Sequence, residues 1–320
     1  MLHLRVIAPS DRTDKVVEVL ERAAGVTNIV LLPGAARRPT GDVVLADVAR
    51  EAANGLITHL KELGLTEDGS ITLEDIEVSI SRGAVEAEAR APGEGDDAVI
   101  WDQFAQRVAA ESRITWAFLA FLAIATQIAA IGVLIPSQIL IVGAMVLGPE
   151  FGAVAAICFG LLRRRWSLIG AASRTLAVGF ATAIAVTLAC ALVSRGLGWV
   201  DPEMLRHNDD VRFIVTPDKW SFIVAVLAGA AGVLSITAGK SSALVGVFIS
   251  VTTVPAAGYM AVALALGRWT EVGGSLAQLV VNVAGMVVAG TATLLLQRFL
   301  WRRYGPRFTV SARSAPREGV

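Results

Sequence analysis

The chain has little charge and few of the residues from which metal and disulfide sites are built. Charged residues make up 18% of its 320 positions, against about 25% in soluble domains. His3 and His59 are separated by a helical pattern and have no nearby cluster of cysteine or histidine. Both cysteines, Cys158 and Cys190, lie inside apolar stretches, where packed thiols are expected. We therefore expect no metal, disulfide or cofactor.

Recognisable catalytic motifs are also missing. There is no nucleophile elbow, and Gly239-Lys240-Ser241 lacks the upstream glycine and the strand that a phosphate-binding loop requires. The acid Glu150 has no second catalytic group in register, which makes it a poor basis for hydrolysis. We therefore do not expect an enzyme, and an intramembrane enzyme is the least favoured alternative.

Apolar residues dominate the chain instead. They account for 54% of it, and the mean hydropathy is +0.62. Most charges lie before Arg113, in a loop at 195–219, or after Arg298, so a polar front precedes an apolar body. No basic segment followed by a short apolar core opens the chain, so we expect no removed signal peptide.

Six apolar segments within 114–299 are long enough to cross a bilayer, which takes about 20 mostly apolar residues. They are 114–135, 137–162, 168–193, 220–238, 241–266 and 272–299. Arg163-Arg164-Arg165, Lys240 and a basic tail at 300–320 fall on one side, and an acidic loop falls on the other. The positive-inside rule then predicts a multi-pass protein of the cytoplasmic membrane, with both termini in the cytoplasm.

The front of the chain, residues 1–81, alternates short strands and helices. Strands are expected at 3–7, 27–32, 42–48 and 71–80, with one helix ending at Gly25 and another at 49–63. The order βαββαβ predicts a small ferredoxin-like α+β domain, a fold that does not define a function. Arg37 and Arg38 lie in a predicted hairpin turn and either contact an anion or are simply solvated.

Residues 82–113 join the two parts. The segment 82–97 is rich in Ala, Gly and Glu, which predicts a linker. An amphipathic helix is expected at 97–113, with Trp101, Phe104 and Val108 on one side. Its polar face is mixed rather than basic, which favours packing against protein over lying on the membrane surface.

The apolar body repeats itself at an offset of 104 residues. Trp116, Phe118, Ser137, Leu140 and Gly170 correspond to Trp220, Phe222, Ser241, Leu244 and Gly274. Proline breaks at Pro149 and Pro255 match at an offset of 106. Because each half has three spans, the second half enters from the opposite side. This predicts an inverted 3+3 repeat, in which broken helices meet at a site near the bilayer midplane.

The first break includes Gly148, Pro149 and Gly152. Pro149 removes the N–H that would bond the Met145 carbonyl, and the glycines tolerate unusual dihedral angles. An opened turn at this depth must be buried in protein or line a wet cavity. The second break adds the hydroxyls of Thr252 and Thr253. Each break could instead be a kink that serves packing, with the two glycines as a helix contact.

Glu150 is an acid at the centre of a predicted span, which costs roughly 2.5–3.5 kcal/mol on insertion scales. It either forms a structural ion pair with Arg174, is neutral, or holds a proton or cation during transport. Gln127 and Gln278 are further polar groups at this depth. The predicted substrate or ion site comprises Gly148, Pro149, Glu150, Gly152, Thr252, Thr253, Pro255 and Asn282.

Several stretches, in order, resemble the uncharacterised bacterial membrane family called domain of unknown function 389. They are SQILIVGAM (137–145), AGAAG (228–232), LVGVFI (244–249) with the following Val254-Pro255, and Asn282. The resemblance implies a multi-span helical domain, sometimes behind a soluble domain, without an established activity. The family tends to have Pro-Leu at Pro149-Glu150 and a double proline at Pro255-Ala256, so the role of the breaks can differ here.

Taken together, the sequence predicts a six-span secondary transporter or channel-like protein for an unknown small solute or ion. The front domain would regulate it or assemble a homo-oligomer in the bilayer, and no nucleic-acid partner is expected. The alternative is a non-transporting receptor or scaffold whose front domain binds a small ligand or a partner, with the breaks serving packing alone.

Overall fold

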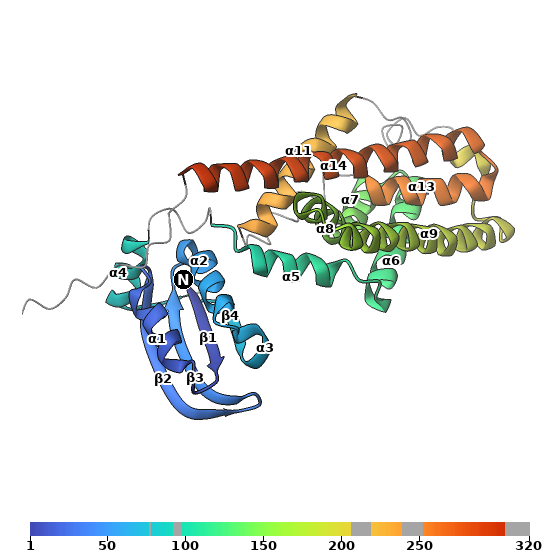
Figure 1. Cartoon of the computed structure of the whole chain (residues 1–320). Helices are drawn as coiled ribbons and strands as arrows, with labels where there is room; N and C mark the ends of the chain where they lie inside the picture. The colour runs from blue at the N-terminus through green and yellow to red at the C-terminus, as the bar shows by residue number, and fades with distance from the viewer. Residues whose placement is uncertain (77, 92–97, 206–218, 239–251, 305–320) are drawn as a thin grey trace, which may run out of the picture. The chain divides into compact units, whose positions relative to one another are not determined.

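A computed structural model describes residues 1–76, 78–91, 98–205, 219–238 and 252–304 (Figure 1). Met1–Asp102 belong to one compact unit and Gln103–Arg298 to a second. The first unit contains a four-stranded antiparallel sheet with helices, and the second is helical throughout the part that is described.

The first unit has the predicted order βαββαβ with one additional short helix. Its elements are β1 (Leu2–Ala8), α1 (Thr13–Arg22), β2 (Val26–Arg37), β3 (Thr40–Val48), α2 (Arg50–Glu62), α3 (Leu65–Asp68) and β4 (Ser70–Asp75). The strands lie in the order β2-β3-β1-β4, and every neighbouring pair is antiparallel. This is the arrangement that the strand and helix pattern predicts.

Alternation along β1 places the core of this unit. Leu2, Leu4 and Val6 are fully buried, and they pack with Leu56 and Leu60 of α2 in one apolar cluster. The residues between them in β1 point to the opposite face of the sheet, as a period of two requires. The helices therefore cover one face of the sheet.

Three predicted boundaries in this part of the chain are wrong. The hairpin strands β2 and β3 extend through most of the predicted turn, and β4 ends at Asp75 rather than at residue 80. Part of the predicted linker forms α4 (Arg82–Arg90), which packs against β2. Its first turn is capped by Ser81 Oγ, which accepts from Ala84 N at 2.9 Å. Residues 92–97 of the predicted linker lie outside the described residues.

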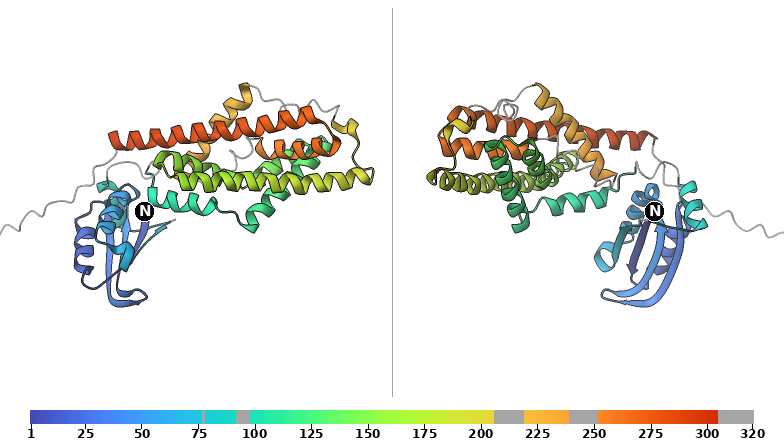
Figure 2. Two further views of the ribbon diagram at one scale, coloured as in Figure 1. Left: turned by 45° about the vertical axis from the view of Figure 1, so that its right-hand side comes forward. Right: turned by 180° about the vertical axis from the view of Figure 1, so that it is seen from behind.

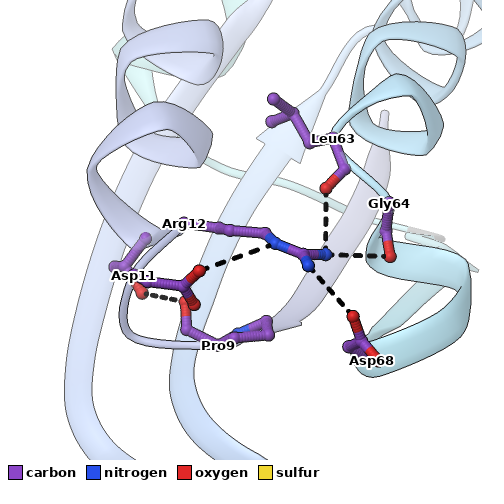
Figure 3. Close-up of polar contacts among 7 residues, drawn as sticks. Pro9, Asp11, Arg12, Leu63, Gly64 and Asp68 are labelled. Carbon is purple, nitrogen blue, oxygen red and sulfur yellow. Dashed lines mark hydrogen bonds and ion pairs between the residues drawn. The ribbon is translucent and has the colours of Figure 1, made fainter.

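Arg12 ties the start of α1 to the turn after α2 (Figure 3). Its Nη1 donates to the carbonyls of Leu63 and Gly64, each at 3.2 Å, and its Nη2 donates to Asp68 at 3.0 Å. The carbonyls at a helix C-terminus lack intrahelical partners and attract cations, so the guanidinium satisfies them. Gly64 has a φ of 75°, which an L side chain rarely adopts.

The second unit begins with α5 (Trp101–Glu111), which corresponds to the predicted amphipathic helix. The apolar helices follow as α6 (Trp116–Leu134), α7 (Gln138–Leu147), α8 (Glu150–Arg163), α9 (Trp166–Gly196), α11 (Lys219–Thr237), α13 (Thr253–Leu266) and α14 (Trp269–Tyr304). A short 3-10 helix spans Pro202–Leu205.

Four of these helices, α6, α9, α11 and α14, are long and apolar enough to cross a membrane. They correspond to the first, third, fourth and sixth predicted spans. The second predicted span is the pair α7 and α8, which is bent by 51° at its break. Of the fifth predicted span, α13 is present as a shorter apolar helix, and residues 241–251 lie outside the described residues.

The two halves of this unit share helix lengths. Both α6 and α11 have 19 residues, and both α8 and α13 have 14. The latter two each end at a left-handed residue, Arg164 and Gly267, before Trp166 and Trp269 begin the next helix. The bounds of these paired helices all lie 103 residues apart, whereas the residue pairs matched in the sequence lie 104 residues apart and the two prolines 106.

Close packing places the start of α13 within the bundle. A Cβ atom at Gly258 would lie 2.9 Å from both Ala130 N and Thr126 O of α6, so only glycine allows this approach. On its other side α13 packs along α9, and the two helices lie alongside each other in both views of Figure 2. The first turn of α13 is completely buried as a result.

Candidate functional site

The second predicted span is broken where the sequence predicts. α7 ends at Leu147, and α8 starts at Glu150 with Pro149 as its N-cap. The carbonyl of Met145, which cannot bond to proline, accepts instead from Gly148 N at 3.4 Å. The break therefore exposes a helix C-terminus and a helix N-terminus to each other, with backbone groups that the helices themselves do not satisfy.

In the described part of the fifth predicted span, Pro255 does not break a helix. α13 begins at Thr253 with Thr252 as its N-cap, so Pro255 is the third helical residue. The first four N–H groups of a helix have no intrahelical acceptor, and proline loses no hydrogen bond there. Pro255 therefore starts the helix rather than interrupting it.

The first residues of α8 and α13 touch each other. Thr253 Oγ1 donates to Glu150 Oε1 at 2.6 Å. Glu150 is only 6% exposed, and its second oxygen, Oε2, has no hydrogen-bond partner among the described residues. That oxygen lies against Gly148, where a Cβ atom would collide with it. The glycine before Pro149 therefore makes room for the carboxyl group.

A run of buried polar groups continues from α13 to α14. Asn282 Nδ2 and Gln278 Nε2 donate to Thr252 Oγ1 at 2.9 and 3.3 Å, and the two amides bond to each other at 3.3 Å. Gln278 Oε1 is a second buried acceptor without a partner among the described residues, and Ser275 Oγ, nearly one turn earlier, is a third such atom. We call Glu150, Thr252, Thr253, Gln278 and Asn282 the polar cluster.

Helix dipoles shape the electrostatics of this cluster. The N-termini of α8 and α13 both meet at it, and each carries about half a positive charge. The carboxylate of Glu150 in the first turn of α8 lies where such ends favour an anion. The C-terminus of α7, whose last carbonyls have no partner further along the helix, adjoins the same point.

A cavity of 380 Å³ opens on the first break. Gly148, Pro149 and Gly152 line one side, the end of α5 and the first turns of α6 line another, and Phe151 and Ile236 complete the lining. Glu111 of α5 lies directly on Gly152, with its Cβ atom 2.6 Å from the position of an added Cβ. The amphipathic helix thus packs against protein, and its contact with the break has no signal in the sequence.

A hydrogen bond fixes the end of α5. Thr175 Oγ1, buried on α9, donates to Ser112 O at 2.6 Å. Glu111 itself pairs with Arg107 one turn earlier at 3.2 Å. These contacts hold one wall of the cavity to the same helix that packs against α8 and α13.

Other predicted partners are not brought together. Arg174 is exposed on α9 and forms no ion pair with Glu150, whose partner is Thr253. Gln127 is half-buried on α6. Cys158 is buried and Cys190 exposed, and both are free thiols. Within the described ranges, no group of three or more His, Cys, Asp or Glu residues could hold a metal ion.

Comparison with known proteins adds one finding. Residues 145–288 match the model of a family described as Domain of unknown function (DUF389). No curated protein and no solved structure matches the chain. The matched segment runs from α7 to α14 and contains the break at Pro149, Pro255 and the whole polar cluster. This part of the chain, residues 145–288, is therefore similar to the DUF389 family.

Proposed function

We propose that the second unit is a secondary transporter or channel-like protein for a small solute or ion, and that the polar cluster is its binding site. One observation carries this proposal: the first residues of two apolar helices, Glu150 of α8 and Thr253 of α13, bond to each other at 2.6 Å. Transporters commonly place their sites where half-helices meet near the midplane of the bilayer.

The energetics of burial support this function over packing alone. A polar group inside a membrane protein is costly unless it is paired, and the described part of the cluster leaves Glu150 Oε2 and Gln278 Oε1 unpaired. Two kinks that served packing would need neither a carboxyl group nor an amide pair between them. The cavity beside Gly148 fits this function, because an opened turn at membrane depth must be buried in protein or line a wet cavity.

The second unit would be an inverted 3+3 repeat with six spans. The equal lengths of α6 and α11, and of α8 and α13, support this arrangement. Four exposed tryptophans support it as well, because each is the first or second residue of one of the equivalent helices: Trp116, Trp166, Trp220 and Trp269. With cytoplasmic termini the first two mark one membrane interface and the last two mark the other, as in an aromatic belt.

Single cysteines test this topology in a background without Cys158 and Cys190. Ser167→Cys and Thr270→Cys lie at equivalent positions after two of the tryptophans. A thiol reagent that cannot cross membranes should label the second from outside intact cells and the first only after lysis. Labelling of both from the same side would contradict the inverted arrangement.

Flux in proteoliposomes tests the function itself. Replacing Glu150 by Gln should abolish flux, or remove its dependence on pH, while the protein still purifies as a folded species. Thr293→Val is a matched control, since Thr293 bonds only within its own helix, to Ala289 O at 2.9 Å. Unchanged flux in the Glu150 variant would remove this residue from the mechanism.

The N-terminal unit would assemble or regulate the protein, and one surface favours this role. On the sheet face away from α1 and α2, Val30 pairs with Leu45, and Leu32 pairs with Val43, which also pairs with Ile7. Val30 and Leu32 are 44 and 43% exposed. We propose that this apolar stripe contacts a second copy of the chain. Leu32→Glu should lower the mass of the detergent-solubilised full chain to that of a smaller assembly.

The non-transporting receptor or scaffold is the alternative function, and the same sheet face is the observation that favours it. In that case the stripe would bind a ligand or partner and the second unit would conduct nothing. Two results together would support this alternative. Liposomes that contain the full chain would show no flux for any inorganic ion or small metabolite, and Leu32→Glu would still lower the mass of the detergent-solubilised chain.

A further inference from the structure

We infer that the polar cluster binds an alkali-metal cation. This rests on the proposed function and makes it more specific, because it names the class of ion that occupies the same site. The starting point is a set of buried oxygen atoms without hydrogen-bond partners among the described residues. They are Glu150 Oε2, Gln278 Oε1 and Ser275 Oγ, from residues that are 6, 1 and 0% exposed.

Glu150 and Gln278 are linked through hydrogen bonds to the adjacent residues Thr253 and Thr252, and Ser275 lies on the same helix as Gln278. Glu150 bonds to Thr253, whose neighbour Thr252 accepts from both Gln278 and Asn282. Adjacent Cα atoms are about 3.8 Å apart, so the carboxyl group and the amides are held around one short backbone segment. Ser275, Gln278 and Asn282 follow at spacings of three and four residues and share one face of α14.

The chemistry of the free atoms selects a cation. A carboxylate oxygen and an amide carbonyl oxygen accept hydrogen bonds or coordinate cations, and they cannot donate. Gln278 Nε2 already donates to both Thr252 Oγ1 and Asn282 Oδ1, and Asn282 Nδ2 donates to Thr252 Oγ1. An anionic or donor-poor ligand would leave these oxygens unpaired, whereas a hard cation would bind them directly.

The charge of the site selects a monovalent ion. Glu150 is the one acidic residue of the cluster, and no salt bridge joins it to a basic residue in the described part of the chain. One positive charge therefore balances the carboxylate, whereas a divalent ion would leave an excess positive side-chain charge, to which the N-termini of α8 and α13 would add. A proton would satisfy one oxygen of Glu150 but leave Gln278 Oε1 unpaired, so the larger ion fits the set better.

The surrounding helices complete the site. The C-terminal end of α7 presents backbone carbonyls at the break, and such ends coordinate cations in broken-helix transporters. The buried Glu150 Oε2 lies against Gly148, and Gly148 also lines the cavity of 380 Å³. An ion could therefore reach the carboxyl group through the first break.

Thermal unfolding of the full chain in detergent tests the inference at fixed pH and ionic strength. Melting should be compared in the chlorides of lithium, sodium, potassium and choline. Ligand binding to the folded state raises Tm, and an alkali ion at about 100 times its Kd should raise it by roughly 5 °C. At least one alkali ion should therefore stabilise the protein relative to choline.

Three variants localise the effect. Glu150→Gln and Gln278→Leu should each abolish the rise in Tm. Gln297→Leu should keep it, since that amide is on the same helix about 28 Å beyond Gln278 and bonds to Thr237 instead. Equal Tm in all four salts, or an alkali-dependent rise that survives both cluster variants, would overturn the inference. Thr252→Val replaces either cluster variant that does not fold.

Flux measurements separate this inference from the proposed function. Alkali-dependent stabilisation without flux would keep the cation site and remove transport. Flux that is equal in choline and in every alkali salt would keep transport and remove the cation site. A dependence of Tm on pH alone, without any response to alkali ions, would replace the metal ion by a proton and overturn the inference as stated.

Discussion

Asp42 in the sheet domain and Glu150 in the helical unit are both buried carboxyl groups, but their oxygens are satisfied differently. Asp42 Oδ2 accepts from Thr13 Oγ1 at 2.6 Å, and its Oδ1 accepts from Gly34 N at 2.7 Å. Glu150 has one such bond and one oxygen without a partner among the described residues. A carboxylate that only stabilises a fold is expected to have both oxygens bonded, so the contrast distinguishes a structural acid from a functional one.

The largest effect is expected at Gly258. It tests whether the oxygens of the polar cluster lack hydrogen-bond partners only because the helices around them are loosely packed. Gly258→Val would place a side chain against the backbone of α6, because a Cβ atom there already lies 2.9 Å from Ala130 N. Overpacking of this kind should cost about 3 kcal/mol or prevent folding. Thermal unfolding in detergent measures it.

Gly143→Val is the matched control, since a Cβ atom at Gly143 has no heavy atom within 4 Å in the described structure. It should leave Tm nearly unchanged. A Gly258 variant as stable as this control would mean that α13 is loosely held, and the unpaired oxygens of the polar cluster would then lose their significance.

The next largest effect concerns Arg12 of the sheet domain, whose guanidinium group has hydrogen-bond partners. Arg12→Met removes the hydrogen bonds to Leu63 O, Gly64 O and Asp68 (Figure 3), and should cost about 1–3 kcal/mol of the stability of this domain. Arg5→Met is the control, because Arg5 is exposed and makes a single long bond to Thr72 at 3.5 Å. Equal destabilisation by the two variants would contradict a special role for Arg12.

The smallest expected effect is a pH dependence. The hydrogen bond from Thr13, followed by that from Gly34 N, lowers the pKa of Asp42 below its ordinary value. Because the folded-state pKa is the lower one, Asp42 stabilises the domain above its unfolded pKa of about 3.9, and this contribution is lost as pH falls through the folded-state pKa. Hydrogen exchange of β3 between pH 2 and 5 should show the loss, and Asp42→Asn should remove it.

Local chemistry explains what could be predicted from the sequence. Pro149 has no N–H and follows Gly148, so the break in the second span could be expected without a structure. Alternation along β1 likewise gave the sheet core. A helix break was predicted at Pro255, but this residue lies in the first turn of α13. A proline in a helical pattern indicates either a kink or a helix start, and only the N-cap at Thr252 distinguishes the two.

Tertiary contacts explain what could not be predicted. Nothing around Glu111 indicates that it lies on Gly152, since the two residues are brought together by the packing of α5. Glu150 had Arg174 as its nearest candidate in sequence, but Thr253 lies 103 residues further on and reaches it only because two helix starts meet. Helix α4 was missed although Ser81 is a recognisable N-cap, because its composition resembles that of a linker.

One pair of variants tests the contrast between the two acids most directly. Asp42→Asn and Glu150→Gln each exchange a buried carboxyl group for an amide of the same size, and their Tm values should be compared with wild type in choline chloride. The account predicts that the Asp42 variant melts lower, since the new amide N–H₂ opposes a donor, while the Glu150 variant melts at the same temperature or higher and loses flux. A Glu150 variant that melts lower and retains flux would show that this carboxyl group is structural, and would contradict the account.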